Sequence, residues 1–465
     1  MKLHFFGAAR QVTGSSVGLE SGDLRVLVDC GLFQERPALD RNWEPFGFEP
    51  ETVDSVLLTH AHLDHCGRIP RLVAQGFGGT ILATSATTDL AKISLLDSAH
   101  IQEEDAAFKR WRHRREGRQV PHPEIPLYTV SDAERCFPHF EPVAYDAPVS
   151  LDRRTTVRFR EAGHILGSSM IDLETREDGR PPKRVVFSGD IGPWDKPLMR
   201  DPSVFEAAEV VVMESTYGDR EHADPGPVDE MLAEVIRSTA ARGGKVVIPA
   251  FAMERAQEVL YYLGRLLRDV RIPELPVFLD SPMAVEVTRI FSRYPSYLDE
   301  EARALLRVGK NPLEFPGLRH IRTVEESKAV NRLERPCVIL AGSGMATAGR
   351  VKHHLANLIE RPSSTILFVG YQAPQTLGRL ILDGAAEVRI LGRMLKVRAR
   401  VARINGFSGH AGRSDLLRWL GAFRRRPTTV FLGHGEESTT LAFAAELGGE
   451  GWSVVVPRSG EVFDV

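Results

Sequence analysis

The stretch THAHLDHCG, residues 59–67, places four metal-ligand side chains in six positions: His60, His62, Asp64 and His65. Imidazole nitrogen and carboxylate oxygen suit zinc and similar divalent ions, which usually take four or five ligands. One short turn cannot direct all four side chains onto one tetrahedron. We therefore predict two ions, the first held by the His60 and His62 pair and the second by the Asp64 and His65 pair, with further ligands supplied from elsewhere.

Two later positions are candidates for the missing ligands. His164 lies in EAGHILGSSM (161–170), between glycines that let the backbone approach a site closely, and Asp190 ends the run RVVFSGD (184–190). Alone, each would be an ordinary buried polar residue. Beside the cluster at 59–67, both are expected to be ligands, and Asp190 could bridge the two ions with its two oxygens.

Short apolar runs, each ending in a polar or glycine-rich turn, recur along the chain and predict buried strands of an α/β fold. They are RVLVDCG (25–31), SVLLTHAH (55–62), RVVFSGD (184–190), VVVMESTYG (210–218), KVVIPAFA (245–252), PVFLDSP (276–282), CVILAGSGM (337–345), TILFVGYQ (365–372) and TTVFLGHGE (428–436). Helical patterns over 228–241 and 255–269 separate several of them. In such folds ligands bind beyond the carboxyl ends of strands. The ionisable residues at those ends are Asp29, His60, Asp190, Glu214 and His434.

Length and composition set the class of protein. A chain of 465 residues predicts about two domains, and its 43% hydrophobic and 26% charged residues are typical of a soluble globular protein. No apolar run approaches the ~18 residues of a membrane helix, and the first residues lack the long apolar region of a signal peptide. We expect no membrane partner and a cytoplasmic location. The four cysteines show no Cys-x-x-Cys spacing, so reduced, buried thiols are expected.

The formal net charge of −3 excludes binding of a polyanion by bulk attraction, so any such contact must be local. Two basic stretches are candidates: KRWRHRREGR (109–118) and RILGRMLKVRARVAR (389–403). The alternative for each is an ordinary solvated helix face or sheet edge. The sequence leaves open whether residues 109–118 contact a polyanionic partner.

Several of these motifs resemble the successive signatures of the metallo-β-lactamase superfamily: Asp29 in LVDCG, His60-Ala-His62-Leu-Asp64-His65, Gly163-His164 and Ser188-Gly189-Asp190. Three more resemble the A, B and C motifs of its β-CASP branch, whose members cleave nucleic acids: Glu214 in MESTYG, His410 in GFSGHAG and His434 in FLGHGEE. The resemblance covers nearly the whole chain. It implies an αββα metallo-β-lactamase sandwich, residues 1–208 and 387–465, with a parallel-sheet β-CASP domain, residues 209–386, inserted between the two parts and a cleft between the domains.

The resemblance also implies a ligand set and catalytic roles. His60, His62, His164 and Asp190 would hold one zinc ion, and Asp64, His65, Asp190 and His434 the second, giving two Zn²⁺ per chain. The catalytic residues would be Asp64, Asp190, His410 and Glu214. In this arrangement His410 contacts the scissile phosphate, Glu214 orients His410, and Asp29 lies behind the ligands and fixes one of the histidines.

A glycine-rich turn, AGSGMATAGR (341–350), leads into a helical pattern, a geometry that presents backbone N–H groups to phosphate. In a β-CASP-like chain it is expected to hold a substrate phosphate through Ser343, Gly344, Met345, Thr347 and Arg350. His353 and His354, just beyond the turn, are expected to be ordinary helix-surface residues.

RNA is favoured over DNA because the C-motif position is typically valine in DNA-processing β-CASP members and histidine in RNA-processing ones. The expected activity is zinc-dependent hydrolysis of single-stranded RNA by a minimal relative of the endonuclease subunit of the cleavage and polyadenylation factor. Whether 5′-to-3′ exonuclease activity accompanies endonuclease activity stays open, as does a homodimer. Two alternatives remain: a non-catalytic RNA-binding or scaffold β-CASP subunit, and another hydrolase of the superfamily acting on a thioester or lactam.

Overall fold

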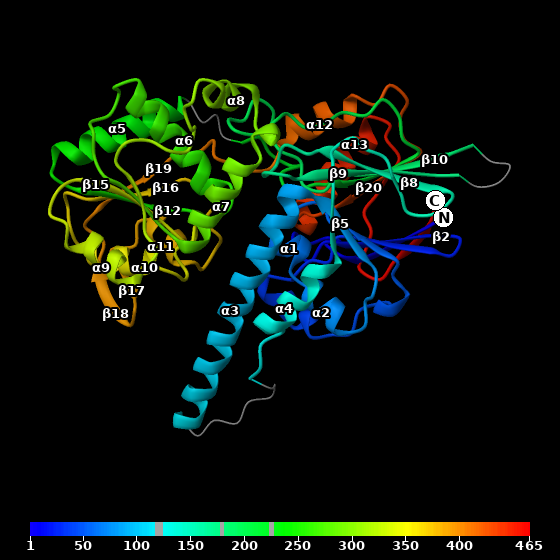
Figure 1. The fold of residues 1–465 in the computed structure, drawn as a ribbon, viewed down its shortest axis with the longest axis horizontal. Helices are drawn as coiled ribbons and strands as arrows, with labels where there is room; N and C mark the ends of the chain where they lie inside the picture. The colour runs from blue at the N-terminus through cyan, green and yellow to red at the C-terminus, as the bar shows by residue number, and fades with distance from the viewer. Residues whose placement is uncertain (117–123, 177–180, 223–226) are drawn as a thin grey trace. The chain divides into compact units, whose positions relative to one another are not determined.

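The computed structural model describes residues 1–116, 124–176, 181–222 and 227–465, which form two compact units (Figure 1). Unit 1 comprises Met1–Trp194, Asp201–Glu221 and His410–Val465, and unit 2 comprises Asp195–Arg200 and His222–Gly409. These limits differ from the expected boundaries at 209 and 387. Strand β11 (Val210–Glu214) pairs within the sheet of unit 1, and β19 (Arg400–Arg403) pairs within the sheet of unit 2.

Unit 1 contains two seven-stranded sheets. The first has the order β22 (Val462–Asp464), β1 (Lys2–Gly7), β2 (Ser16–Ser21), β3 (Leu24–Val28), β4 (Ser55–Leu57), β5 (Thr80–Thr84), β6 (Phe140–Val143). The second has the order β21 (Val454–Val455), β20 (Thr429–Gly433), β11, β10 (Lys183–Phe187), β9 (Ser169–Thr175), β8 (Thr155–Glu161), β7 (Val149–Ser150). In the first sheet β3, β4, β5 and β6 are parallel, and in the second β10, β11, β20 and β21 are parallel; the other pairings in both sheets are antiparallel. The strands whose carboxyl ends carry the predicted ligands are among the parallel ones.

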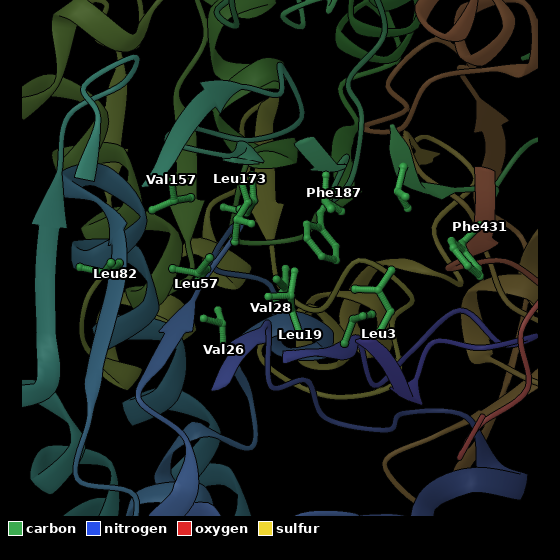
Figure 2. Packing of buried hydrophobic residues seen from close by; sticks show 14 of the residues in the cluster. Leu3, Leu19, Val26, Val28, Leu57, Leu82, Val157, Leu173, Phe187 and Phe431 are labelled. Carbon is green, nitrogen blue, oxygen red and sulfur yellow. The ribbon is translucent and has the colours of Figure 1, made fainter. Parts of the chain in front are cut away.

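The apolar faces of these two sheets pack against each other (Figure 2). Leu3, Leu19, Val26, Val28 and Leu57 come from the first sheet and meet residues of the second sheet. These partners include Val157, Leu173, Phe187 and Phe431. Burial of this layer removes large apolar side chains from water and fixes the strand ends that position the site.

Helices cover the outer faces of both sheets of unit 1 (Figure 1). They are α1 (Leu63–Cys66), α2 (Ile69–Ala74), α3 (Ser85–Glu116) and α4 (Val130–Cys136) beside the first sheet, and α12 (Arg413–Gly421) and α13 (Glu437–Gly449) beside the second. Trp419 of α12 and Phe443 of α13 are fully buried against the second sheet. Three 3₁₀ helices also occur in the described part of unit 1: Arg36–Asn42, Pro50–Thr52 and Phe137–His139. The predicted αββα sandwich is confirmed.

Unit 2 is built on a parallel sheet, as predicted for the inserted domain. Its order is β14 (Leu318–His320), β13 (Val277–Asp280), β15 (Cys337–Ala341), β12 (Lys245–Pro249), β16 (Thr365–Phe368), β19. The helices are α5 (Val228–Ala241), α6 (Arg255–Arg268), α7 (Pro282–Arg293), α8 (Glu300–Arg307), α9 (Val324–Arg332), α10 (Val351–Leu358) and α11 (Leu377–Leu382), with a 3₁₀ helix at Pro295–Tyr297. A hairpin of β17 (Glu387–Ile390) and β18 (Arg393–Lys396) packs with α10 and α11.

All nine apolar runs singled out in the sequence contain a strand of one of these three sheets. The helical patterns over 228–241 and 255–269 correspond to α5 and α6. Within the described ranges, no helix combines the length and the apolar character needed to cross a membrane. The four cysteines are free and buried.

Candidate metal centre

The carboxyl ends of five parallel strands of unit 1 bring together side chains that are far apart in the sequence. Asp29 follows β3 and His60 follows β4 in the first sheet; Asp190 follows β10, Glu214 ends β11 and His434 follows β20 in the second sheet. All five side chains are buried. The two sheets therefore meet at a cluster of carboxylates and imidazoles.

The first ligand group contains His60, His62, His164 and Asp190. His62 Nδ1 lies 3.1 Å from His60 Nε2 and 3.2 Å from His164 Nε2. Asp190 Oδ2 lies 3.5 Å from His60 Nε2 and 3.6 Å from His164 Nε2. Ligands at zinc–nitrogen distances of about 2.0–2.1 Å stand about 3.3–3.4 Å apart at the corners of a tetrahedron. The four donor atoms have the spacing of one zinc coordination sphere.

The second group contains Asp64, His65 and His434. His65 Nε2 lies 3.0 Å from His434 Nε2, which lies 3.5 Å from Asp64 Oδ2. The same His65 nitrogen is 3.3 Å from Asp190 Oδ1. Asp190 thus presents one oxygen to each group, which is the arrangement of a bridging carboxylate.

Asp190 also provides a test of whether this cluster fits a metal. Its Oδ1 is buried and accepts no hydrogen bond from any described residue. A buried carboxylate oxygen without a donor is costly, and a cation among the surrounding ring nitrogens removes that cost. The donor set of the two groups, five histidines and two aspartates of which Asp190 is shared, is one that zinc prefers, so the residues fit the ion.

Electrostatics favour the ligand forms of several groups. Burial lowers the pKa of His62 to about 4 and that of His60 well below its ordinary value, with the nearby His65 adding to the effect at His60. Burial opposes ionisation of Asp64, but the hydrogen bond from His434 and the charges of the neighbouring histidines together outweigh burial and lower the pKa of Asp64 to about 2. Neutral imidazole and ionised carboxylate are the forms that coordinate metal.

Asp29 lies next to the two groups of donor atoms and contacts one of their histidines. Its Oδ2 accepts a hydrogen bond from His65 Nδ1 at 2.7 Å, and its Oδ1 accepts one from the Thr59 N–H at 2.8 Å. Because His65 Nδ1 is hydrogen-bonded to Asp29, its Nε2 is the ring nitrogen that faces the second group of donor atoms. Asp29 has a φ of 62°, a conformation that aspartate tolerates better than most residues.

Thr59 is a site residue that the sequence reasoning missed. Its hydroxyl lies 3.0 Å from both oxygens of Asp29 and 3.1 Å from His60 Nδ1. It therefore links Asp29 to a ligand of the first group, as His65 links it to the second. The sequence feature that could have indicated a role for Thr59 was its position directly before His60, just after a buried strand.

His410 and Glu214 form a pair beside the ligands. His410 Nδ1 lies 3.2 Å from Glu214 Oε2, and Glu214 Oε1 accepts a hydrogen bond of 2.6 Å from the Ile191 N–H. The ring centroids of His410 and His164 are 4.6 Å apart. Burial would lower the pKa of His410, but the Glu214 and Asp190 carboxylates outweigh burial and raise the pKa to about 9.

His434 is held by its backbone as well as its ring. Its φ is 48°, and its N–H donates to the Ala8 carbonyl at 2.7 Å. The Thr216 hydroxyl lies 3.2 Å from His434 Nδ1 and donates to the His434 carbonyl at 3.0 Å. Thr216 was also missed by the sequence reasoning, although it stands two residues after Glu214 in MESTYG.

The expected phosphate loop belongs to unit 2, between β15 and α10. Ser343 and Thr347 lie together, with 3.3 Å between their hydroxyl oxygens, and Gly344 and Met345 lie between them in the chain. Arg350 donates to Asp280 Oδ1 and to the Arg322 carbonyl, each at 2.7 Å. The Arg350 guanidinium is thus already held within unit 2.

The expectation that His354 lies on a helix surface is wrong. His354 is fully buried; its Nε2 lies 2.6 Å from Asp280 Oδ2 and its Nδ1 lies 2.9 Å from Asn331 Oδ1. Positions 351, 354, 355 and 358 form the face of α10 that packs on the sheet, and His354 is on that face. His353, one position earlier, is exposed as expected.

The two basic stretches have different structures. Residues 109–116 end helix α3, whereas 117 and 118 lie outside the described residues. Residues 389–403 form most of the β17–β18 hairpin and then β19, so the alternation in that stretch does indicate strands.

Comparison with known families matches three domain models in chain order. The metallo-beta-lactamase superfamily domain matches residues 18–185, the Beta-Casp domain residues 256–381, and the Zn-dependent metallo-hydrolase RNA specificity domain residues 394–457. The last of these ranges contains both His410 and His434.

Two relatives cover almost all of the chain. Ribonuclease TTHA0252 of Thermus thermophilus is 41% identical over 461 residues, 99% of either protein. Transcription termination factor FttA of Methanosarcina mazei is 34% identical over 462 residues, 96% of this chain and 69% of that protein. A solved structure of a protein of unknown function from Enterococcus faecalis V583 has a TM-score of 0.56 at 13% identity, with 99% of each chain covered, which shows similarity of fold alone.

Proposed function

Because this chain belongs to the β-CASP ribonuclease family of the metallo-β-lactamase superfamily, we propose that it hydrolyses single-stranded RNA with two zinc ions. The observation that carries the proposal is the pair of ligand groups sharing Asp190, one completed by His164 and the other by His434. A single-ion site would not need a carboxylate that presents one oxygen to each group.

The residues that would hold the ions follow from the donor distances. His60, His62 and His164 would hold one ion, Asp64, His65 and His434 the other, and Asp190 both. Bound zinc supplies Lewis acidity, which makes water nucleophilic at neutral pH and neutralises charge on a phosphate. Asp29 and Thr59 keep the ligand histidines oriented toward the ions.

His410 is proposed to contact the scissile phosphate. Glu214 accepts at His410 Nδ1, and the Ile191 N–H holds Glu214 in turn, so the ring has a fixed orientation. Its other nitrogen, Nε2, is the atom proposed to donate to a phosphate oxygen or to the leaving oxygen. A donor aimed in advance at developing charge is worth several kcal/mol in other hydrolases.

RNA is proposed as the substrate on two grounds. The RNA specificity domain model matches the region that contains His434, and the relative at 41% identity is a ribonuclease. The histidine at position 434 agrees with the resemblance to RNA-processing members. The first ground also disfavours a thioester or lactam substrate, and the complete set of donor atoms disfavours a non-catalytic subunit.

Metal content and cleavage can be measured on the same protein. Purified chain is expected to contain about two zinc ions and to cleave single-stranded RNA faster than DNA of the same sequence. Asp190→Asn removes the shared charge, so it should lower the zinc content and reduce RNA cleavage about 100-fold or more. Asp23→Asn, an exposed aspartate in the turn after β2, is the matched control and should change neither quantity.

Three results would contradict the proposal: no zinc under zinc-replete conditions, faster cleavage of DNA, or full activity in Asp190→Asn. RNA labelled separately at each end shows whether the products arise by internal cleavage or by removal of nucleotides from the 5′ end.

A further inference from the structure

The last three turns of α3 carry large aromatic side chains in an exposed position. Phe108 is 57% exposed and Trp111 is 55% exposed. With Arg112 and Arg115, which are also exposed, they stand at spacings i, i+3, i+4 and i+7 and therefore share one face of the helix. We call these four residues the α3 platform.

The platform side chains lie close to one another, with the two rings tilted by 33°. The ring centroids of Phe108 and Trp111 are 5.8 Å apart, and the Arg115 guanidinium lies 5.6 Å from the Trp111 ring. Arg112 lies 4.0 Å from Glu116, an exposed and weak ion pair. The helix side that carries Arg110 and His113 is occupied, because both residues contact Glu124. The platform is thus the outward side of this end of the helix.

Packing within unit 1 does not account for the platform. The first two-thirds of α3 buries ten residues against the rest of unit 1, and the last of them is Ala106. Beyond that point the helix continues away from both sheets and past α4 (Figure 1). Two neighbouring aromatic rings that are each more than half exposed are unusual on a helix, and such surfaces mark binding sites.

Charge decides between the occupants that an exposed aromatic face can accept. Residues 106–115 contain five lysine or arginine residues and no acid. A second copy of this chain, joined through the same face on both copies, would bring these cations against each other. A polyanion with flat apolar groups, by contrast, complements both the guanidinium groups and the rings.

We propose that the α3 platform is an accessory binding surface for single-stranded RNA. Bases would stack on Phe108 and Trp111, and Arg112 and Arg115 would contact the adjacent phosphates. The proposal rests on the proposed function only in taking RNA as the substrate. It assigns the basic stretch at 109–118 a role that neither the metal ligands nor His410 supplies.

The length of α3 sets which RNA can reach the platform. The helix starts beside the loop that carries His164, since the Thr84 and Thr87 hydroxyls both donate to the Gly167 carbonyl at 2.7 Å. Phe108 lies 23 residues after the first residue of the helix, which is about 35 Å along its axis. At ~3.4 Å per stacked nucleotide, an RNA must exceed about ten nucleotides to contact both regions.

Two double variants and a matched control test this. Phe108→Ala/Trp111→Ala removes the stacking surface, and Arg112→Ala/Arg115→Ala removes two platform charges. Lys109→Ala/Arg114→Ala removes the same number of charges from the same part of α3 but outside the platform face. Circular dichroism verifies that each variant retains its helix content.

Binding is measured by fluorescence anisotropy on the zinc-loaded proteins, with a phosphorothioate RNA of about 25 nucleotides that resists cleavage. Phe108→Ala/Trp111→Ala is expected to weaken binding about 10-fold or more, because each stacked base contributes substantially. Arg112→Ala/Arg115→Ala should weaken it more than the control does. Hydrolysis of an RNA of about five nucleotides, too short to span the distance, should stay unchanged in all three variants.

Unchanged affinity of Phe108→Ala/Trp111→Ala for the long RNA would overturn the proposal. So would a change from dimer to monomer in sedimentation with unchanged RNA affinity, because that outcome assigns the platform to a second copy. Failure of the proposed function is seen separately, as absence of cleavage of the short RNA by the unaltered protein.

Discussion

His410 differs from the other histidines of the site in what surrounds its ring. The ligand histidines have ring nitrogens 3.0–3.2 Å from one another, whereas His410 Nδ1 faces Glu214 at 3.2 Å and is 3.8 Å from Asp190 Oδ2. It belongs to none of the groups of donor atoms that could hold a metal ion. Binding of metal and contact with substrate are therefore expected to be separable at this residue.

Replacement of His410 with alanine is expected to lower kcat for RNA cleavage about 100- to 10,000-fold, the range of a lost proton donor. Zinc content should stay within error of the unaltered protein, because His410 is not among the donor atoms. His353→Ala, an exposed histidine of unit 2, is the control and should retain full activity. Loss of one zinc ion from His410→Ala would instead make His410 a ligand.

At the level of residues, the sequence indicated which donor side chains cluster better than it indicated the residues that contact them. The histidines and aspartates that cluster in unit 1 stood in recognisable motifs, so the sequence could predict a metal-binding role for them. Thr59 and Thr216 were missed because a hydroxyl beside a ligand carries no distinctive spacing. His354 was misplaced because one helical turn of mixed residues does not reveal which face packs on a sheet; only its contact with buried Asp280 does.

Among the elements, the short helix α1 shows how tightly the ligand turn is packed. Gly31 follows β3, and its N–H donates to the Ser15 carbonyl at 2.9 Å, while Ser15 N–H donates to the Asp64 carbonyl at 2.8 Å. A Cβ at position 31 would stand 1.6 Å from that Asp64 oxygen. The backbone that carries Asp64 and His65 thus packs directly on the turn after β3.

Gly31→Ala is therefore expected to displace α1, with a loss of about 1–3 kcal/mol in the free energy of unfolding. Zinc held by Asp64 and His65 should be lost first, so the zinc content should fall toward one ion per chain. Gly448→Ala near the end of α13, where a Cβ meets nothing within 4 Å, is the control and should leave both quantities nearly unchanged. A stable Gly31→Ala protein that still binds both ions would show that the turn after β3 accommodates the methyl group without displacing α1.

Elements buried on both faces were the most predictable, because a parallel strand reads as a continuous apolar run. The antiparallel strand β8 was not singled out, since it alternates between buried and partly exposed residues. The expected domain boundaries at 209 and 387 also differ from the limits of the two units. Strand β11 resembles the strands of the inserted sheet in sequence, and only its pairing with β10 and β20 shows that it belongs to unit 1.

At the scale of the whole molecule, unit 1 is closed by the two ends of the chain. Strand β22 pairs with β1, and His434 N–H donates to the Ala8 carbonyl. The ligands run from His60 to His434, so most of the chain must fold before both groups of donor atoms exist. Zinc held as proposed would join segments of unit 1 that are remote in sequence, whereas the described residues of unit 2 contribute none of these donors.

Zinc removal should therefore loosen unit 1 selectively, which hydrogen–deuterium exchange can measure by segment. In the presence of a chelator, residues 59–66, 163–169 and 429–434 should exchange faster, by up to about 1000-fold per ion if zinc is normally present at 1000 times its Kd. Strands β12 and β15 of unit 2 should be unaffected and serve as the internal control. Restored zinc should restore slow exchange. Equal acceleration in both units would mean that the metal stabilises the chain globally, and no change in unit 1 would place the ions elsewhere.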